Sequence, residues 1–187
     1  MVTFEYSDHQ AAEPKKKVAI SAVPLICEFT IIRDQRERSG GWTFTGLHAT
    51  SKEKYRPIIV PLEEQHMKTA DYQISGLPVF VERKSHSDFI GSCTNGHANL
   101  RKEFERMAEI IAAGGKCAMI VESSLDAVHR EVTDLLSQRK ASYEGIEGLL
   151  SSWPWKYGVP ITFCGTRELA ERMCFKMFKA EWERRSV

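Results

Sequence analysis

The most constraining feature of the sequence is a nearly continuous apolar run at residues 117–123, CAMIVES. A strand of this kind lies in a sheet that is covered on both faces, because neither of its sides alternates with polar residues. The segment 99–113 before it has apolar residues at helical spacing and ends at Gly114-Gly115, which predicts a helix. A helix followed by a doubly buried strand favours an α/β domain.

Shorter patterns predict the other elements. We expect strands over 25–33, 56–62, 71–74, 78–84 and 159–165, and helices over 126–140, 143–153 and from Thr166, as N-cap, to about 182. The first four strands are expected to form an antiparallel meander. The last helix is expected to turn Leu169, Met173, Phe175 and Met177 to the core. The predicted fold class is α/β, with a mixed central β-sheet flanked by helices.

Composition limits the class of protein. A chain of 187 residues fits one domain, and its 42% hydrophobic and 27% charged residues are not typical of disorder. The five cysteines form no Cys-x-x-Cys pair, which argues against a disulfide framework or a zinc cluster. We find no apolar signal core and no run of 18 apolar residues, so we expect a cytoplasmic protein with no membrane partner.

Residues 1–17 are polar and lack periodicity, so we expect a flexible N-terminal lead-in to a single domain over 18–187. They contain the densest basic cluster, Lys15–Lys17. A net charge of +1 does not by itself indicate nucleic-acid binding, so local clusters must carry any such case. A solvated arm explains this cluster better than a DNA-binding arm does.

The strand predicted at 78–84, PVFVERK, ends in charged residues. Residues two apart share a face of a strand, so Glu82 and Lys84 point the same way and Arg83 points the other way. Taken alone, Glu-x-Lys occurs often by chance, and it would also suit an exposed face of a sheet. The neighbouring acids decide between these readings.

Asp71 is the nearest second acid, and a Gly-Leu-Pro bend could fold its strand against that of Glu82. Mg²⁺ usually takes one or two carboxylates, with waters and substrate phosphate. A metal held by Asp71 and Glu82 would polarise a phosphate and lower the pKa of a bound water. Lys84 would orient that water or stabilise charge at phosphorus. This pattern indicates metal-dependent phosphodiester cleavage.

The flanking residues resemble the XPF-type structure-specific nucleases, whose domain is named for the excision-repair cross-complementation proteins. The signature of that family is Gly-Asp, a spacer, Glu-Arg-Lys, three residues and Asp. Here Asp71, Glu82-Arg83-Lys84 and Asp88 fill it. The family also begins with a strand that ends in Asp-x-Arg-Glu, as at Asp34–Glu37. The resemblance covers about residues 28–180.

The resemblance implies a restriction-endonuclease-like fold, dependence on Mg²⁺ or Mn²⁺, and hydrolysis of DNA near branches, often by a homodimer. The active-site residues that it implies are Asp34, Glu37, Asp71, Glu82, Arg83, Lys84 and Asp88, with Asp71 and Glu82 as the metal ligands. Five acids balanced by only Arg36, Arg83 and Lys84 would repel one another, so a cation should stabilise the site.

Two features depart from the family pattern. Ala70 stands where the family usually has Gly, so the local turn is expected to differ. We expect no tandem helix-hairpin-helix module, with which eukaryotic and archaeal relatives grip duplex DNA, so we expect that an accessory protein could supply this contact. This form looks like the stand-alone bacterial and bacteriophage members, which places the protein in a bacterial or phage-infected cytosol.

Other residues are candidates for DNA contact. Lys52 and Lys54 follow Trp42 in a segment without clear periodicity, which suits backbone tracking and base stacking, although a partly packed hairpin explains it equally well. Arg36 and His86 are further candidates because they lie within the two motifs. Ser92 and Cys93 could suggest a nucleophile, but they have no identifiable base partner, and the polarity of a loop explains them better. Trp153 and Trp155 are expected at the core edge or a dimer contact.

The predicted function is therefore a metal-dependent DNA endonuclease acting on branched or duplex DNA. One alternative is a catalytically silent DNA-binding or scaffolding subunit, because the family includes inactive members. Such members typically lose their carboxylates, whereas Asp34, Glu37, Asp71 and Glu82 are all present here. A second alternative is a nuclease for duplex ends or single strands, which the sequence does not separate from a branch-specific enzyme.

Overall fold

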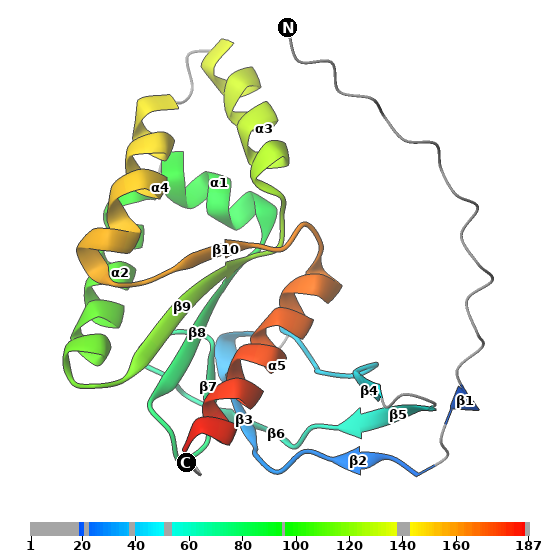
Figure 1. Ribbon diagram of the computed structural model, residues 1–187. Coiled ribbons are helices and arrows are strands. Elements are labelled where there is room, and N and C mark those ends of the chain that lie inside the picture. The colour runs from blue at the N-terminus through cyan, green and yellow to red at the C-terminus, as the bar shows by residue number, and fades with distance from the viewer. Residues whose placement is uncertain are drawn as a thin grey trace, which may run out of the picture.

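The computed structural model describes residues 19–20, 23–37, 40–50, 54–94, 96–137 and 143–185. Its centre is a six-stranded sheet in the order β10-β9-β8-β7-β3-β6 (Figure 1). The strands are β3 (Ile31–Asp34), β6 (Leu62–Gln65), β7 (Tyr72–Ile74), β8 (Val79–Lys84), β9 (Lys116–Val121) and β10 (Ile161–Phe163). The pairs β3–β7 and β7–β8 are antiparallel and the other three are parallel, which confirms a mixed sheet.

Helices cover both faces of this sheet. One face carries α1 (His86–Thr94), α2 (His97–Ala112), α3 (Leu125–Ser137) and α4 (Tyr143–Tyr157), and the other carries α5 (Arg167–Arg184). The doubly buried strand β9 explains the arrangement, because Met119 and Val121 join the core under α1–α4 while Ile120 joins the core under α5. The expected burial on both faces is confirmed.

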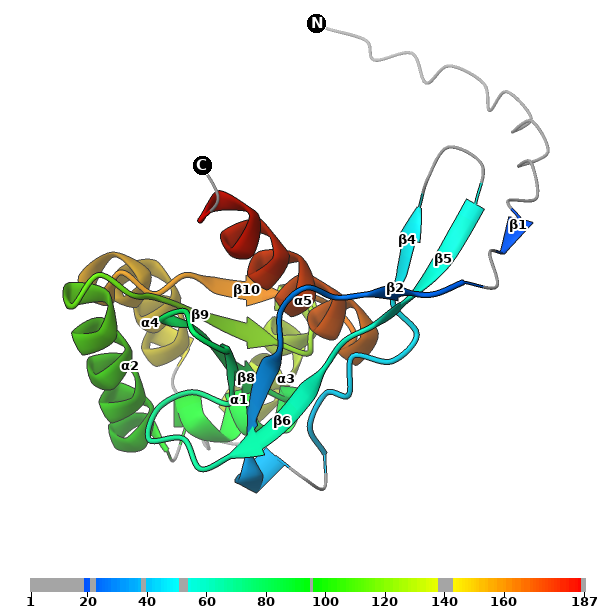
Figure 2. The ribbon, with the colours of Figure 1, turned by 90° about the horizontal axis from the view of Figure 1, so that it is seen from below.

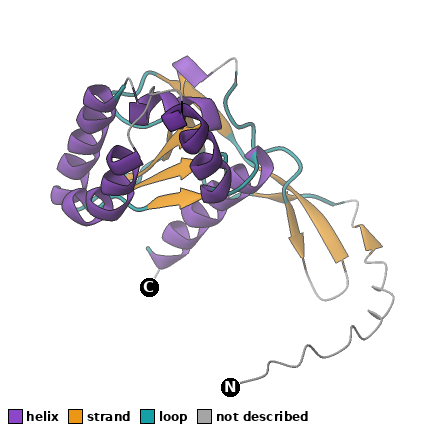
Figure 3. Cartoon of the chain, turned by 90° about the horizontal axis from the view of Figure 1, so that it is seen from above, coloured by secondary structure: helices purple, strands orange, loops and turns teal. Residues whose placement is uncertain are grey.

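A second, smaller sheet forms an arm that extends away from the helices (Figures 2 and 3). It contains β1 (Ala19–Ile20), β2 (Leu25–Ile26), β4 (His48–Thr50) and β5 (Lys54–Ile59). In this sheet β5 pairs in parallel with β1 and β2, and antiparallel with β4. The prediction of a single strand at 25–33 and another at 56–62 is wrong, since each is divided between the two sheets.

The two segments that pass from the small sheet to the central sheet stay paired with each other along the way. The backbone N–H of Cys27 donates to Ile59 (2.8 Å) and that of Ile31 donates to Pro61 (2.9 Å), so the two chain segments continue side by side across both breaks. They run parallel, and β3 separates β6 from β7. The predicted antiparallel meander is therefore wrong for this part of the chain.

Among the helices, α1 was not expected, since Ser92 and Cys93 were predicted in a loop. It is helical because Phe89, Ile90 and Cys93 join the core. Helix α2 ends before Gly114, as predicted. None of the helices that the structure describes is both long and apolar enough to cross a membrane.

Thr166 caps α5 as predicted, accepting a hydrogen bond from the N–H of Leu169 at 3.3 Å. Burial of Phe175 is confirmed, but Leu169 and Met173 are 47% and 37% exposed. Beside Phe175, the buried residues of α5 are Ala170, Cys174 and Phe178, which repeat at i, i+4 and i+8 and so follow one stripe of the helix. The prediction is therefore right for Phe175 and for Met177, which packs partly buried against this core, and wrong for Leu169 and Met173. The lead-in predicted for residues 1–17 lies outside the described residues.

Candidate active site

The end of β8 places charged side chains on both faces of the sheet. Glu82 and Lys84 are each 8% exposed and lie on the face of α2, where the ammonium of Lys84 is 2.8 Å from a carboxylate oxygen of Glu103. Arg83 lies on the face of α5 and donates to Glu122. The alternation predicted for PVFVERK is confirmed.

Asp71 stands beside Glu82, because β7 and β8 pair with Tyr72 opposite Val81. The N–H of Asp71 donates to Val81 (3.1 Å), and the N–H of Arg83 donates to the Asp71 carboxylate (2.8 Å). The turn between the strands contains Gly76 at φ 78°, a left-handed conformation that favours glycine. The bend expected to join the two acids is therefore confirmed.

These acids form the floor of a recess of about 230 Å³ between the sheet, α2 and the loop before β7. The lining residues are Arg36, Glu37, Lys68, Thr69, Ala70, Asp71, Glu82, Glu103 and Arg106. Three of them, Arg36, Lys68 and Arg106, are exposed cations. The recess thus combines a buried acidic floor with a basic rim.

Burial sets the electrostatics of the floor. It raises the pKa of Asp71 well above its ordinary value, and the neighbouring charge of Glu82 raises that pKa further. Burial also raises the pKa of Glu82, against the opposing effect of Lys84. Burial alone would lower the pKa of Lys84. The carboxylates of Glu82 and Glu103, whose oxygens lie 3.0 Å and 2.8 Å from the ammonium nitrogen, have a larger opposite effect and raise this pKa. Lys84 therefore stays charged, while the charged forms of Asp71 and Glu82 are disfavoured by burial and by each other.

A divalent cation fits this donor set. The described residues contain no group of three or more His, Cys, Asp or Glu side chains arranged to hold a metal ion. Asp71 and Glu82 nevertheless offer two crowded carboxyls, and Mg²⁺ commonly binds one or two carboxylates while waters and phosphate complete its shell. These two are the residues that could hold a metal.

The ERCC4 domain family matches residues 33–177 of this chain. The chain belongs to the ERCC4 domain family. A structure of XPF from Aeropyrum pernix is similar, with a TM-score of 0.54 and 16% identity over 83% of this chain and 68% of that one. Another, "XPF from Aeropyrum pernix, complex with DNA", has a TM-score of 0.49 and 18% identity over 79% and 66% of the two chains. No match was found among curated proteins.

The family match confirms the resemblance predicted from the motifs. The likeness to the first archaeal structure concerns the fold, and it confirms the expected restriction-endonuclease-like α/β class. Of the acids in the two ERCC4 motifs, Glu37, Asp71 and Glu82 line the recess. The other two, Asp34 and Asp88, do not, so the expectation of five converging acids is wrong.

Asp34 and Asp88 are instead bound locally. Asp34 is fully buried and accepts hydrogen bonds from Arg36 (2.8 Å from its N–H, 2.7 Å from its Nε) and from the N–H of Met67 (2.6 Å). Burial alone would raise its pKa, but these bonds outweigh burial and lower the pKa of Asp34. Asp88 is exposed and exchanges hydrogen bonds with Ser85 at the start of α1, as an N-terminal cap does.

The DNA-contact candidates have different outcomes. The prediction that Trp42 stacks on a base is wrong, because its ring is fully buried and stacks on the ring of Tyr72, with 4.8 Å between the centroids. His86 is not free for a phosphate either, since one ring nitrogen lies 2.7 Å from the Ser123 hydroxyl and the other contacts Glu131. The side chain of Arg36 is 65% exposed at the recess.

Two further candidates are not described. Lys52 lies outside the described residues, and Lys54 opens β5 with a side chain that is also outside them. Whether they contact DNA stays a prediction.

Sequence reasoning missed Glu103, Lys68, Arg106 and Glu122. Glu103 had a signal, because it lies three residues after Leu100 and four before Met107, on the stripe of α2 that otherwise enters the core. Glu122 had one as well, since it directly follows the apolar run of β9. A charged residue at a position predicted to be buried indicates that it pairs with an opposite charge, but the sequence does not identify that residue.

Proposed function

We propose that the protein is a DNA endonuclease that hydrolyses phosphodiester bonds with Mg²⁺ or Mn²⁺. The observation that carries the proposal is the carboxyl pair of the half-buried Asp71 and the buried Glu82, which the start of β7 and the end of β8 hold beside the ammonium of Lys84. Crowded acids and one fixed cation, in a recess with a basic rim, suit a metal ion and a phosphodiester.

Asp71 and Glu82 would hold the divalent cation. Their raised pKa values follow from burial and like charge, both of which a cation offsets. When bound, such an ion supplies Lewis acidity toward the phosphate and a water of lowered pKa. The N–H of Arg83 keeps one oxygen of Asp71 in place, so only part of that carboxylate is open to the recess.

Lys84 supplies a fixed positive charge. Its raised pKa keeps it protonated at neutral pH, and Glu82 and Glu103 fix the ammonium between them. We expect this group to orient the attacking water or to stabilise the charge that develops at phosphorus. The deeply placed ammonium needs no rearrangement to do so.

The basic rim would bind the DNA backbone. Arg36, Lys68 and Arg106 are exposed around the acidic floor, so they can reach phosphates next to the one that is cut. Each phosphate contact steepens the dependence of binding on salt concentration. Lys52 and Lys54 remain proposed contacts farther along the chain.

We also propose, from the family resemblance, a preference for branched, flap or fork DNA in repair, recombination or phage DNA processing. The cytosol of a bacterium or a phage-infected cell is the compartment proposed. A homodimer is the proposed assembly, supported by Trp155, whose side chain is 90% exposed on α4. An accessory protein would supply further grip on the DNA.

The test is cleavage of labelled fork, flap, duplex and single-stranded DNA with Mg²⁺, Mn²⁺ or EDTA. Wild-type protein should cut only with metal, and Asp71→Ala and Glu82→Ala should bind DNA without cutting it. Asp126→Ala is the matched control, because that acid is 74% exposed in a surface ion pair on α3. Normal cutting by Asp71→Ala would refute the metal assignment.

The same assay separates the alternatives. Binding without cleavage under every metal condition would indicate a catalytically silent DNA-binding or scaffolding subunit. Preference for blunt duplex or single strands over forks and flaps would contradict branch selectivity while leaving the nuclease proposal intact.

A further inference from the structure

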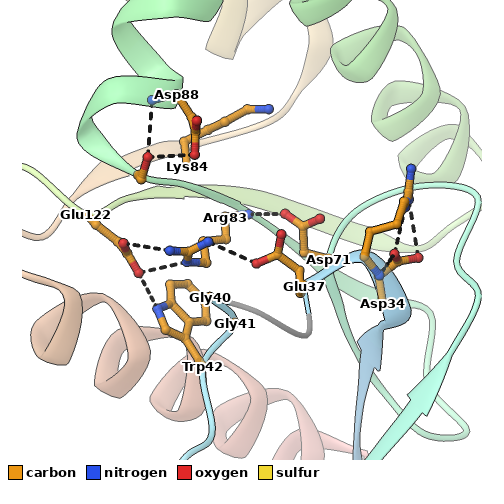
Figure 4. A network of polar contacts seen from close by, with 12 residues as sticks. Asp34, Glu37, Gly40, Gly41, Trp42, Asp71, Arg83, Lys84, Asp88 and Glu122 are labelled. Atoms are coloured by element: carbon orange, nitrogen blue, oxygen red, sulfur yellow. Dashed lines mark hydrogen bonds and ion pairs between the residues drawn. The ribbon is translucent and has the colours of Figure 1, made fainter.

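Glu122 is a buried carboxylate without a place in the proposed chemistry. Its side chain is 8% exposed and follows directly after β9. One oxygen accepts from the indole N–H of Trp42 (2.6 Å) and from Nε of Arg83 (2.8 Å), and the other accepts from Nη2 of Arg83 (3.0 Å). Figure 4 shows the dashed contacts from this side chain to Arg83 and Trp42, with Arg83 lying between Glu122 and Glu37.

Arg83 connects Glu122 to the recess. Its Nη1 donates to Glu37 at 3.0 Å, and its backbone N–H donates to Asp71 at 2.8 Å. Its side chain is only 11% exposed, so the guanidinium is held between two carboxylates and is not presented to a substrate. Arg83 therefore fixes two acids that line the recess, Glu37 and Asp71. Glu122 in turn fixes the guanidinium of Arg83 on the α5 side of the sheet.

Trp42 fixes Glu122 in turn. Its fully buried ring stacks on Tyr72, so the indole N–H has one direction open to it, toward Glu122. The loop that carries Trp42 also returns to the recess, because the N–H of Gly41 donates to the backbone oxygen of Glu37 at 2.5 Å.

Helix α5 also holds the loop that carries Trp42. The guanidinium of Arg167, at the start of α5, donates to the carbonyls of Gly40 and Gly41, both at 2.6 Å. Both the backbone and the carboxylate of Glu37 are thus held by groups on the α5 side of the sheet.

We infer that Glu122 and Trp42 are positioning residues, which act through Arg83 to fix Glu37 and Asp71 for metal binding and phosphodiester cleavage. This inference rests on the proposed function of the recess. Neither side chain touches the recess, so neither is a catalytic residue. Their effect is geometric, because a bidentate guanidinium–carboxylate pair defines direction as well as distance.

The experiment compares Trp42→Phe, which removes the N–H donor but keeps an aromatic ring, with Glu122→Gln, which keeps the shape and removes the charge. We expect each variant to lower kcat by about 10- to 100-fold and to weaken Mn²⁺ binding by about 10-fold, as loss of groups that orient metal ligands does. KM for DNA should stay within about twofold, because the basic rim is untouched. Mn²⁺ affinity is measured without DNA from the electron paramagnetic resonance signal of the free ion.

The controls are Trp155→Phe and Glu147→Gln, both exposed on α4 and outside the network. The double variant should lose no more activity than the worse single variant, since both act through Arg83. If Glu122→Gln does not fold, Trp42→Phe and the Mn²⁺ measurement still decide. A lower Tm with kcat and Mn²⁺ affinity within twofold of wild type would show a purely structural network and overturn the inference.

The failure of the proposed function is distinguishable. If wild-type protein binds Mn²⁺ but cuts no DNA, the nuclease proposal fails, and weaker Mn²⁺ binding by the variants would still support positioning of the acids. If wild-type protein neither binds Mn²⁺ nor cuts, both proposals are overturned.

Discussion

Strand β8 carries buried charge on both of its faces, and the two faces balance that charge differently. On the α5 side, Arg83 meets Glu122 and reaches Glu37 at the edge of the recess, both within 3.0 Å, and Arg167 lies 3.7 Å from Glu122. Every one of the Arg83 contacts is a charge-assisted hydrogen bond. This face resembles a structural ion-pair network, in which burial is compensated by partners.

On the α2 side, the balance is negative. Lys84 is shared between Glu82 and Glu103, and Asp71 stands nearby with no cation of its own among the contacts that the structure describes. The raised pKa values of Asp71 and Glu82 report this crowding. The comparison teaches that compensated charge fixes the geometry, while uncompensated charge a few ångströms away is what a cation-dependent site needs.

The largest expected effect is on the crowded face. Asp71→Asn should abolish detectable cleavage, because it removes one proposed metal ligand, and should raise the free energy of unfolding at neutral pH, because it removes one of two crowded acids of like charge. The amide oxygen can still accept from the N–H of Arg83. Cleavage assays and urea denaturation without metal check both parts. A variant that cuts normally, or that is less stable than wild type, would contradict the comparison.

The compensated face should respond in the opposite direction. Arg83→Ala should destabilise the fold by about 3–5 kcal/mol, because it removes the hydrogen-bonded cation of the buried Glu122, which keeps only the partly exposed Arg167 at 3.7 Å, and of the partly buried Glu37. Arg130→Ala is the control, since its pair with Asp126 on α3 is exposed and contributes under about 1 kcal/mol. Equal losses in the two variants by urea denaturation would show that the Arg83 network is not a structural element.

The loop that carries Trp42 offers a matched pair of glycines. A Cβ at Gly41 would lie 2.5 Å from the backbone oxygen of Glu37 and 2.9 Å from the Tyr72 hydroxyl, whereas a Cβ at Gly40 would meet nothing within 4 Å. Gly41→Ala should therefore cost about 1–3 kcal/mol through overpacking. Gly40→Ala should stay within about 0.5 kcal/mol. Thermal unfolding of the two variants side by side tests the difference.

The crowded acids should also give stability a characteristic pH dependence. Because the folded-state pKa of Asp71 and that of Glu82 lie above their ordinary values of 3.8 and 4.5, the folded protein holds protons that the unfolded chain has released. Stability from this source is greatest below those ordinary values and is lost as the pH rises through the raised pKa values. Asp34 acts oppositely, because its lowered pKa gives stability that is lost as the pH falls.

Urea denaturation from pH 4.5 to pH 8 measures this slope. Mg²⁺ should restore stability most at the higher pH, where both acids are charged, and Asp71→Asn should flatten the profile. A profile that neither Mg²⁺ nor Asp71→Asn changes would show that the acids are not crowded in solution.

The smallest expected effect concerns the loop before β7. Ala70 adopts φ 62°, a left-handed conformation that costs a residue with a Cβ about 1–2 kcal/mol. Ala70→Gly removes this strain but loosens the unfolded chain and deletes a buried methyl, so the net gain should be about 0.5 kcal/mol or less. A clear loss in Tm would show that the methyl group contributes more than the strain costs.

The sequence predicted the parts of the site that depend on local geometry. The two-residue period of a strand placed Glu82 and Lys84 on one face, and the bend at Gly76 brought Asp71 beside them. Two predictions failed for a local reason that periodicity does not contain. Asp34 and Asp88 accept hydrogen bonds from residues close to them in the chain, Arg36 and Ser85, and do not line the recess.

Other failures had a distant cause. Trp42 follows two glycines and the first motif, and the sequence left it open between stacking on a base and packing in a hairpin. It is buried because its ring packs on Phe44 and Tyr72 in the core under α5, where Glu122, 80 residues later in the chain, accepts from its N–H. Glu103 likewise owes its role to Lys84, which approaches it from a different element.

The sequence by itself determined which residues alternate along β8, where α2 and α5 begin or end, and which family the motifs resemble. These are properties of neighbours in the chain, and they follow from the fixed periods of strands and helices and from capping. Only the tertiary structure decided which charges meet. Glu37, Arg83, Glu122 and Trp42 come from four separate segments, and a charge is compensated or left crowded by distances through space, which no local period encodes.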